Sequence, residues 1–206
     1  MTTSELSSRG RPAGLTGDDL IAAAREVFLE HGYAGASMDQ VARRARVSKA
    51  SLYREHSSKS ELYAAVVRQW AMAGQDAMRP ALDRMQRSAD VRGALIGLAE
   101  TMRAGILSPP VMAMRRLVTA EASAHPDVAR MYLENSWNAN IDRLAAAFAA
   151  VAASGRLRPH DPHAAAEQFT WLIIGAPLNA RMLGGEASAP PAADAVDLFL
   201  AGYGAD

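Results

Sequence analysis

Residues 37–59, SMDQVARRARVSKASLYREHSSK, constrain the fold more than any other part of this 206-residue chain, because they predict two short helices joined by a tight turn. From Met38 onward, apolar residues stand at i, i+3, i+4 and i+7, which gives the first helix one apolar face. Ser37, followed three residues later by Gln40, is typical of the capping box that begins a helix. In the second helix, only Leu52 is expected to point inward. The pattern predicts a half-buried helix followed by a largely exposed one.

The positive charge of this stretch is local. Residues 37–59 contain six Lys and Arg residues against two acidic ones, a net charge of +4, whereas the whole chain is formally neutral with 22 basic and 22 acidic residues. A buried helix followed by an exposed basic helix is the arrangement of a helix-turn-helix, whose second helix enters the major groove of DNA. A basic patch is also what phosphate binding requires. The stretch therefore predicts a DNA-binding element.

Residues 21–67 resemble the DNA-binding domain of the TetR family of bacterial transcriptional regulators. The resemblance is carried by FLEHGY at the end of the first helix, VARRA in the second, VSKASLY in the recognition helix and SKSEL at the start of the fourth. It implies an all-α fold with an N-terminal three-helix helix-turn-helix domain and a C-terminal helical bundle for ligand binding and dimerisation. The expected organisation is a flexible basic arm over residues 1–15, the helix-turn-helix domain over 16–62 and the C-terminal domain over 63–206.

The resemblance also implies which side chains contact DNA. Ser37, Tyr53 and Lys59 match family positions that contact backbone phosphate, while residues 49–51 and Arg54 are candidates for contacts with base edges. The full set of candidate DNA-binding residues is Ser37, Arg44, Arg46, Lys49, Ala50, Ser51, Tyr53, Arg54 and Lys59.

Three residues depart from the family pattern. Arg46 stands at the turn position where the family usually has Gly, so a left-handed backbone there would cost about 1 kcal/mol. Glu55 and His56 stand where the family commonly has His or Tyr followed by Phe, and Glu55 would repel a nearby phosphate. These departures leave one alternative open, a helical protein-interaction module whose head has lost DNA binding.

Capping signals and chain breaks place the remaining helices. Thr16 with Asp19 predicts the start of a first helix that ends at Gly32, and Ser58 with Glu61 predicts the start of a fourth helix. The helices expected after the recognition helix cover residues 58 to about 78, 90–107, 110–124, 127–153, 162–183 and 192–203.

A protein that binds DNA through a helix-turn-helix needs two DNA-binding domains, here called heads, because one short helix contacts too few base pairs for high affinity and selectivity. In the family, the last two long helices of each subunit form the dimer interface. Here this implies the stretches around residues 169–182 and 196–203. The first stretch lies in the predicted helix 162–183, which Pro177 is expected to kink. The candidate interface residues are Trp171, Leu172, Leu178, Leu198 and Phe199, with the core of one subunit as the alternative to the preferred interface.

The family resemblance also implies a small-molecule effector that binds among the C-terminal helices and changes the separation of the two heads. Met adapts to irregular apolar shapes and could line such a pocket, although Met at helical spacing is more often ordinary core. The preferred candidates are Met72, Arg103, Met112, Met131, Trp137, Asn138 and Trp171. Further candidates are Met102, Met114, Asn135 and Asn140. No cluster of charges identifies the effector.

Several classes of protein are excluded. The chain has no cysteine, which rules out disulfide scaffolds, thiol catalysis and cysteine-bound zinc. The first residues lack the apolar core of a secretory signal, and the longest apolar run, residues 144–153, is too short to span a bilayer. We therefore expect a cytoplasmic protein with no membrane partner.

An enzyme or metalloprotein would have to be built around His160, Asp161 and His163. Asp161 and the following Pro162 are instead typical of a helix start, and no further His lies at ligand spacing. The remaining histidines have no evident nucleophile, so no catalytic triad can be assembled. We expect no enzyme activity, no metal and no cofactor. The sequence predicts a homodimeric, ligand-released repressor that binds a palindromic DNA operator.

Overall fold

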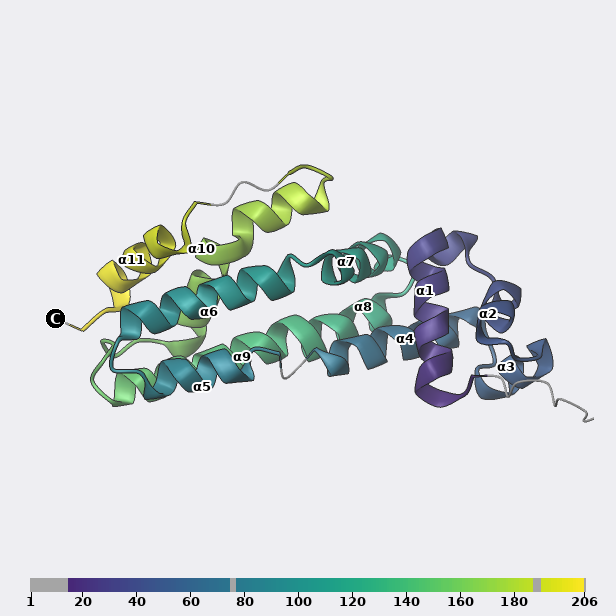
Figure 1. The fold of residues 1–206 in the computed structure, drawn as a ribbon, viewed down its shortest axis with the longest axis horizontal. Helices are drawn as coiled ribbons and strands as arrows, with labels where there is room; N and C mark the ends of the chain where they lie inside the picture. Colours follow the sequence, from purple (N-terminus) through teal and green to yellow (C-terminus); the bar gives the residue numbers. More distant parts are fainter. Residues whose placement is uncertain (1–14, 75–76, 187–189, 206) are drawn as a thin grey trace, which may run out of the picture. The chain divides into compact units, whose positions relative to one another are not determined.

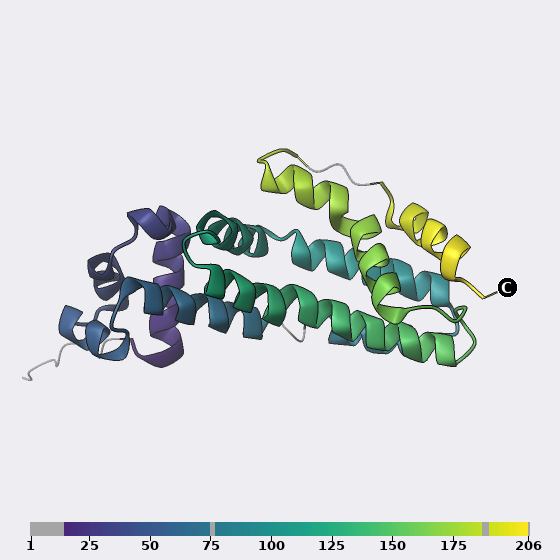
Figure 2. The ribbon, with the colours of Figure 1, turned by 180° about the vertical axis from the view of Figure 1, so that it is seen from behind.

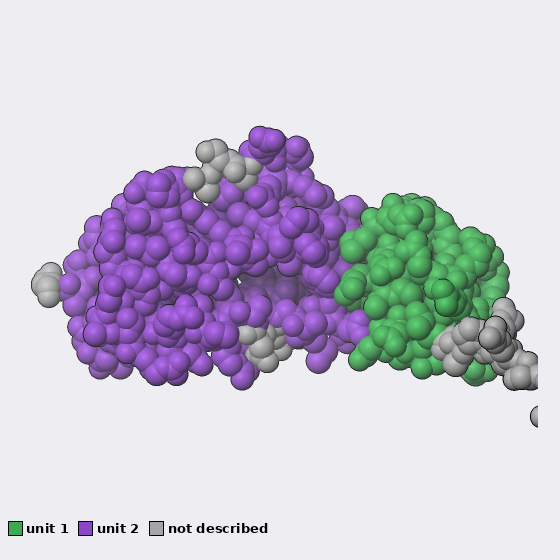
Figure 3. Space-filling view, in the orientation of Figure 1, with its two compact units in different colours: residues 1–66 green, residues 67–206 purple. Residues whose placement is uncertain are grey.

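A computed structural model describes residues 15–74, 77–186 and 190–205 of the chain. The described residues form helices and connecting segments, with one isolated antiparallel bridge between Leu157 and Gly204. They divide into two compact units, residues 1–66 and 67–206, which Figure 3 distinguishes by colour. The predicted all-α fold is confirmed. Among the described helices, none combines the length and the apolar character needed to cross a membrane.

The first unit consists of three helices and the beginning of a fourth. These are α1 (Gly17–Gly35), α2 (Met38–Ala45), α3 (Lys49–Glu55) and α4 (Lys59–Ala73), the last of which contains the boundary between the units (Figure 1). The side chains buried between them include Leu20, Ala24, Val27, Phe28, Val41, Ala45, Leu52, Leu62 and Tyr63. The apolar stripe predicted for α2 therefore faces this core.

The helix starts in the first unit agree only partly with the predicted capping pairs. The capping box of Ser37 and Gln40 is present in both directions. Thr16 is the N-cap of α1, but its side chain makes no capping hydrogen bond, so that pair was predicted wrongly. At α4, the backbone N–H of Glu61 donates to the Ser58 hydroxyl as predicted. The Glu61 carboxylate, however, accepts from Ser57, one residue earlier than a capping box requires.

The second unit is a bundle of longer helices. Its elements after α4 are α5 (Arg79–Arg87), α6 (Val91–Ile106), α7 (Pro109–Glu121), α8 (Pro126–Tyr132), the π-helical turn η1 (Leu133–Asn138), α9 (Ala139–Ala153), α10 (Pro162–Met182) and α11 (Ala192–Tyr203). α9 packs along α10, and α6 packs against α5, α10 and α11. The rings of Phe148, Phe169 and Phe199 meet in the core, with centroids 5.0 to 5.5 Å apart.

Two of the predicted helices that reach into this unit were wrong in extent. α4 ends at Ala73, and a separate helix, α5, occupies residues 79–87. Pro80 lies in the first turn of α5, where a missing backbone N–H costs little, so it begins a helix rather than only ending the one before it. The helix predicted over residues 127–153 is interrupted by η1. Pro177 lies buried inside α10, and Figure 2 shows α10 changing direction along its length.

Candidate nucleic-acid interface and internal cavity

The exposed helix α3 is held by very few contacts of its own. Leu52 is its one buried residue, and Ser48 caps its start by accepting a hydrogen bond from the backbone N–H of Ser51 at 3.0 Å. A helix of seven residues is not stable alone, because helix nucleation is costly. α3 therefore depends on the packing of Leu52 and on the turn that connects it to α2. Lys49, Tyr53 and residues near them are left facing solvent.

The turn between α2 and α3 is formed at Arg46, which has φ 58° and ψ 30°. This is the left-handed conformation, in which a side chain such as that of Arg46 has a steric cost of about 1 kcal/mol. The backbone N–H of Arg46 donates to Arg43, and that of Val47 donates to the Ala42 carbonyl at 3.0 Å. The two bonds close α2 in a Schellman arrangement. Arg46 is exposed, so its side chain is accessible to solvent at the turn.

Two of the candidate DNA-binding cations are already paired with acidic side chains. Arg44 donates to Glu26 at 3.0 Å and to Glu30 at 2.6 Å, and the hydrogen bond to Arg44 holds the pKa of Glu30 below its usual value. Lys49 lies 2.8 Å from Asp39, which raises the pKa of the lysine. These pairs link α1 to α2 and α2 to α3, so they position the helices as well as carrying charge.

Three other arginines are free to meet an anion. Arg43, Arg46 and Arg54 are exposed, and none forms an ion pair within the described part of the chain. Ala50 and Tyr53 are also exposed on α3. The positive charge that has no acidic partner among the described residues therefore lies at the α2–α3 turn and at the end of α3. The sequence alone did not indicate this concentration.

The two predicted phosphate contacts at the edges of the surface have internal roles. The ammonium group of Lys59 donates to the carbonyls of Tyr33 at 2.8 Å and Ala36 at 3.0 Å, and it lies 4.4 Å from the centre of the Tyr33 ring. The Ser37 hydroxyl is engaged with Gln40 in the capping box. Their contacts with DNA remain predictions. Glu55 is exposed at the end of α3, where it reduces the positive charge of the surface.

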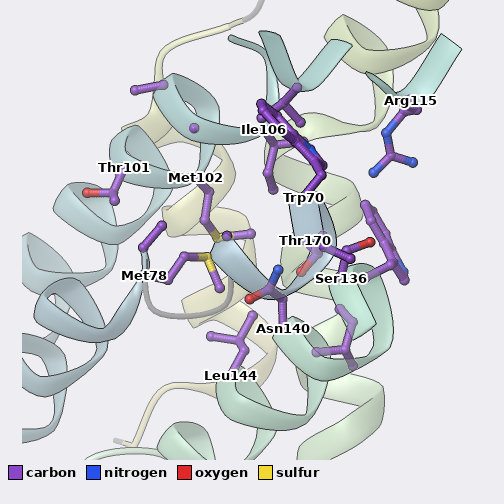
Figure 4. A pocket seen from close by; sticks show the side chains of 18 of the residues that line it. Trp70, Met78, Thr101, Met102, Ile106, Arg115, Ser136, Asn140, Leu144 and Thr170 are labelled. Atoms are coloured by element: carbon purple, nitrogen blue, oxygen red, sulfur yellow. The ribbon is translucent and has the colours of Figure 1, made fainter. Parts of the chain in front are cut away.

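The second unit contains a cavity of about 490 Å³, within the range of small-molecule pockets (Figure 4). Figure 3 shows the surface of this unit hollowed. The residues that line the cavity come from α4, from α6 to α10 with η1, and from the segment between α4 and α5, and they include Trp70, Met78, Thr101, Met102, Ile106, Arg115, Tyr132, Ser136, Trp137, Asn140, Leu144 and Thr170. Most of these side chains are apolar. The cavity therefore offers a bound molecule few polar groups.

The structure brings few of the predicted pocket residues to this cavity. Trp137 lines it, as do the further candidates Met102 and Asn140. The others lie elsewhere in the second unit. Met72 is 59% exposed, Asn138 is exposed, Met131 is half-buried and Met112 belongs to the hydrophobic core. Met114 is likewise buried, and Asn135 donates to the Met131 carbonyl.

Two further predicted pocket residues, Trp171 and Arg103, are not among the residues that line the cavity. Trp171 is 54% exposed and packs on Trp137, with the ring centres 5.5 Å apart. Arg103 donates to the backbone carbonyls of Ile173 and Pro190. Sequence reasoning missed Arg115 and Thr170, because no sequence pattern indicates which polar residue of an amphipathic helix faces a cavity.

The candidate dimer residues separate into two groups. Leu178 and Phe199 are buried in the core of the second unit. Trp171, Leu172 and Leu198 are exposed on α10 and α11, and Leu198 is 63% exposed. Exposed large apolar side chains on neighbouring helices are typical of a surface that meets another protein.

The residues that would have formed a metal site have structural roles. The Asp161 carboxylate caps α10 by accepting from the backbone N–H groups of His163 and Ala164. His160 bonds to the Arg158 carbonyl through Nδ1 and packs between the rings of Phe148 and Tyr203. Within the described residues, no three His, Asp or Glu side chains are grouped as metal ligands.

Comparison with protein families gives two matches along the chain. Residues 20–66 match the family described as bacterial regulatory proteins, tetR family. Residues 93–205, more than half of the chain, match the AefR-like transcriptional repressor, C-terminal domain. The first match contains α2 and α3, and the second contains most of the helices that line the cavity.

The chain is also similar to individual proteins. It is 41% identical over 100 residues to the HTH-type transcriptional activator FasR of Mycolicibacterium smegmatis, a match that covers 41% of this chain and 46% of FasR. The chain thus spans less than half the length of that relative. A solved TetR-family regulator from Mesorhizobium loti is 26% identical with a TM-score of 0.85, covering 90% of this chain and 95% of that one. The flavonoid-responsive regulator FrrA is 30% identical with a TM-score of 0.72, covering 91% and 96%.

Proposed function

Because the chain belongs to the TetR family of DNA-binding transcriptional regulators, a family without enzyme activity, we propose that it is a ligand-released repressor that binds a palindromic operator as a homodimer. The observation that carries the proposal is the exposure of α3, which buries only Leu52 and follows a turn at which Arg43 and Arg46 are exposed, with no ion-pair partner among the described residues. Such a helix can enter a major groove while α2 supports it. A regulator of this kind acts on DNA, so we propose the cytoplasm as its compartment.

The proposed roles of the side chains follow from their surroundings. Arg54 and Ala50 are candidates for base contacts, because they are exposed on α3. Arg43 and Arg46 are candidates for phosphate contacts, because they have no ion-pair partner among the described residues and stand beside the turn. Lys49 would have to leave Asp39, or share it, in order to contact DNA.

A second copy of the chain supplies the second head in this proposal. Trp171, Leu172 and Leu198 would form the contact, because they are large, apolar and exposed on α10 and α11. Leu198→Asp is expected to convert a dimer into a monomer in sedimentation experiments, since a charge cannot be buried there without a partner. Leu133→Asp, at an exposed leucine outside these two helices, is the matched control. A monomeric wild-type protein would contradict the proposal.

The effector would act through α4. Trp70 and Ala71 of this helix line the cavity, while its first residues belong to the first unit. A molecule that binds one arrangement of α4 more tightly than another shifts the population toward that arrangement. We expect binding of the effector to release the protein from DNA. The similarity to FasR, described as an activator, favours transcriptional activation as the second candidate function.

The proposal is tested by selecting fragments of the source genome that bind the purified protein. A repressor should enrich a palindromic site, and its affinity should fall steeply with salt concentration because phosphate binding releases counterions. Arg54→Ala should weaken binding to the enriched site by about 1 to 3 kcal/mol if Arg54 contacts a guanine, with little change on random DNA. Arg130→Gln, at an exposed arginine of α8, is the control.

The outcomes separate the candidates. A reporter gene behind the enriched site should be silenced by a repressor and induced by an activator. Absence of any salt-dependent binding to DNA would instead support the protein-interaction module whose head has lost DNA binding.

A further inference from the structure

The polar groups of the cavity suggest what kind of molecule it binds. Among the described lining residues, Arg115, on α7, is the one with a permanent charge, and none of them is Asp or Glu. The described part of the wall is therefore largely apolar and carries one positive charge. A charge in such surroundings is costly unless an opposite charge accompanies it.

Arg115 has no acidic partner among the residues that the structure describes. Within the described residues, its guanidinium group forms no ion pair, its Nε is buried without a hydrogen-bond acceptor, and the group lies 5.2 Å from the centre of the Trp137 ring. Tyr132 also lines the cavity, but burial raises the pKa of its phenol, so it is neutral at physiological pH. The indole ring thus orients a guanidinium whose donors remain available.

A second polar group faces the cavity from α10. Thr170 is only 2% exposed, yet its hydroxyl has no hydrogen-bond partner among the described residues. Thr101, also at the cavity, satisfies its hydroxyl by donating to the Gly97 carbonyl at 2.8 Å, as helical threonines commonly do. The Thr170 hydroxyl is therefore available to a bound molecule. Figure 4 shows Arg115 to one side of Thr170 and Asn140.

The walls of the cavity favour a ligand with a flat aromatic ring system between the groups that contact Arg115 and Thr170. Trp70 and Trp137 contribute indole rings, and Tyr132 contributes a phenol ring. Aromatic rings stack on one another with an energy beyond that of simple burial. An aromatic ligand would therefore gain more here than a flexible chain, which also loses more conformational entropy when it binds.

We propose that the effector of this protein is an aromatic organic anion, whose acidic group pairs with Arg115 and whose remaining polar group bonds to Thr170. This inference rests on the proposed function, because it assigns a chemical class to the effector of that function. It concerns recognition in the cavity alone, so it can be tested without DNA.

Two dyes with nearly the same aromatic body provide the test. Anilinonaphthalene sulfonate carries an acidic group, and phenylnaphthylamine lacks it. With the full-length protein, energy transfer from the tryptophans should report one bound dye per chain, and the sulfonate should bind more tightly. Arg115→Gln should weaken the sulfonate by about tenfold or more, because a charged hydrogen bond is lost, and should leave phenylnaphthylamine within about twofold.

Control variants and probes make each outcome decisive. Arg130→Gln, at an exposed arginine on α8, should change neither affinity. Displacement of the sulfonate by naphthoate at lower concentrations than by decanoate would support an aromatic body, and the reverse order would overturn that part. If wild-type protein binds both dyes equally, or if Arg115→Gln weakens both alike, the anionic class is wrong. The wild-type comparison needs no variant, so it stands even if Arg115→Gln misfolds.

The proposed function is measured separately. Failure to bind genomic DNA contradicts the regulator proposal whatever the dyes do. DNA binding that persists while the two dyes bind equally contradicts only the class of effector.

Discussion

The Nε of Arg103 donates a hydrogen bond to the carbonyl oxygen of Ile173 at a distance of 3.1 Å. In an unbroken helix, that carbonyl would accept from the backbone N–H of residue 177. Residue 177 is a proline, which has no N–H, so the kink in α10 leaves the Ile173 carbonyl without its helical donor. Arg103, from α6, replaces this donor with a side chain.

Arg103→Met is predicted to lower the free energy of unfolding by about 1 to 3 kcal/mol, because it leaves the Ile173 carbonyl unsatisfied. In a Pro177→Ala background the same change should cost less, since alanine restores the backbone donor. Urea unfolding of the two single variants and the double variant measures the difference. Equal costs in both backgrounds would show that Arg103 does not replace the missing N–H.

Arg46→Gly is predicted to raise the free energy of unfolding by about 1 kcal/mol, because glycine adopts the left-handed backbone of this turn without a steric cost. The same variant should bind DNA more weakly, since it removes an exposed positive charge. Thermal unfolding and DNA titration give the two effects. Arg43→Gly is the control, because glycine inside α2 should destabilise the protein. A less stable Arg46→Gly protein would contradict the prediction.

Lys59→Ala is predicted to lower the free energy of unfolding by about 1 to 3 kcal/mol, because two backbone carbonyls lose a charged donor. If Lys59 also contacts a phosphate, the dependence of log affinity on log salt should fall by about one. Thermal unfolding and DNA titrations at several salt concentrations separate the two roles. Lys49→Ala should leave stability nearly unchanged, since its ion pair is exposed. Loss of stability with an unchanged salt dependence would assign Lys59 a structural role only.

Thr170→Val is predicted to raise the free energy of unfolding of the ligand-free protein by about 1 kcal/mol, because it removes a buried hydroxyl that has no partner. Calorimetry without added ligand checks this value. Thr101→Val should show no such gain, since its hydroxyl is already bonded to Gly97. A destabilised Thr170→Val protein would indicate that the hydroxyl has a bond after all.

The helix-turn-helix could be predicted from the sequence because its determinants are local. The apolar stripe of α2, the Ser37 cap and the single inward residue Leu52 lie within a few residues of one another and were all confirmed. The hydrogen bonds from Lys59 to the carbonyls of Tyr33 and Ala36 were missed, because they join residues that are distant in the sequence.

The cavity could not be predicted in this way, and η1 gives one reason. At about 100° per residue, an unbroken α-helix would place Tyr132 and Ile141 on opposite sides, nine residues apart. Both line the same cavity, because the wider π turn between them winds less per residue and changes the phase of the helix. Sequence periodicity assumes one constant angle per residue, so it cannot place these two residues on the same face.

The π turn also affects how this region can tolerate changes in length. It accommodates one residue more than an α-helical turn would, between two helices whose inward faces are each set by their own packing. Deleting a single residue from 133–138 could therefore convert the turn to regular α-helix while both neighbouring helices keep their contacts. Elsewhere in α8 or α9, the same deletion would rotate every following side chain away from its partners.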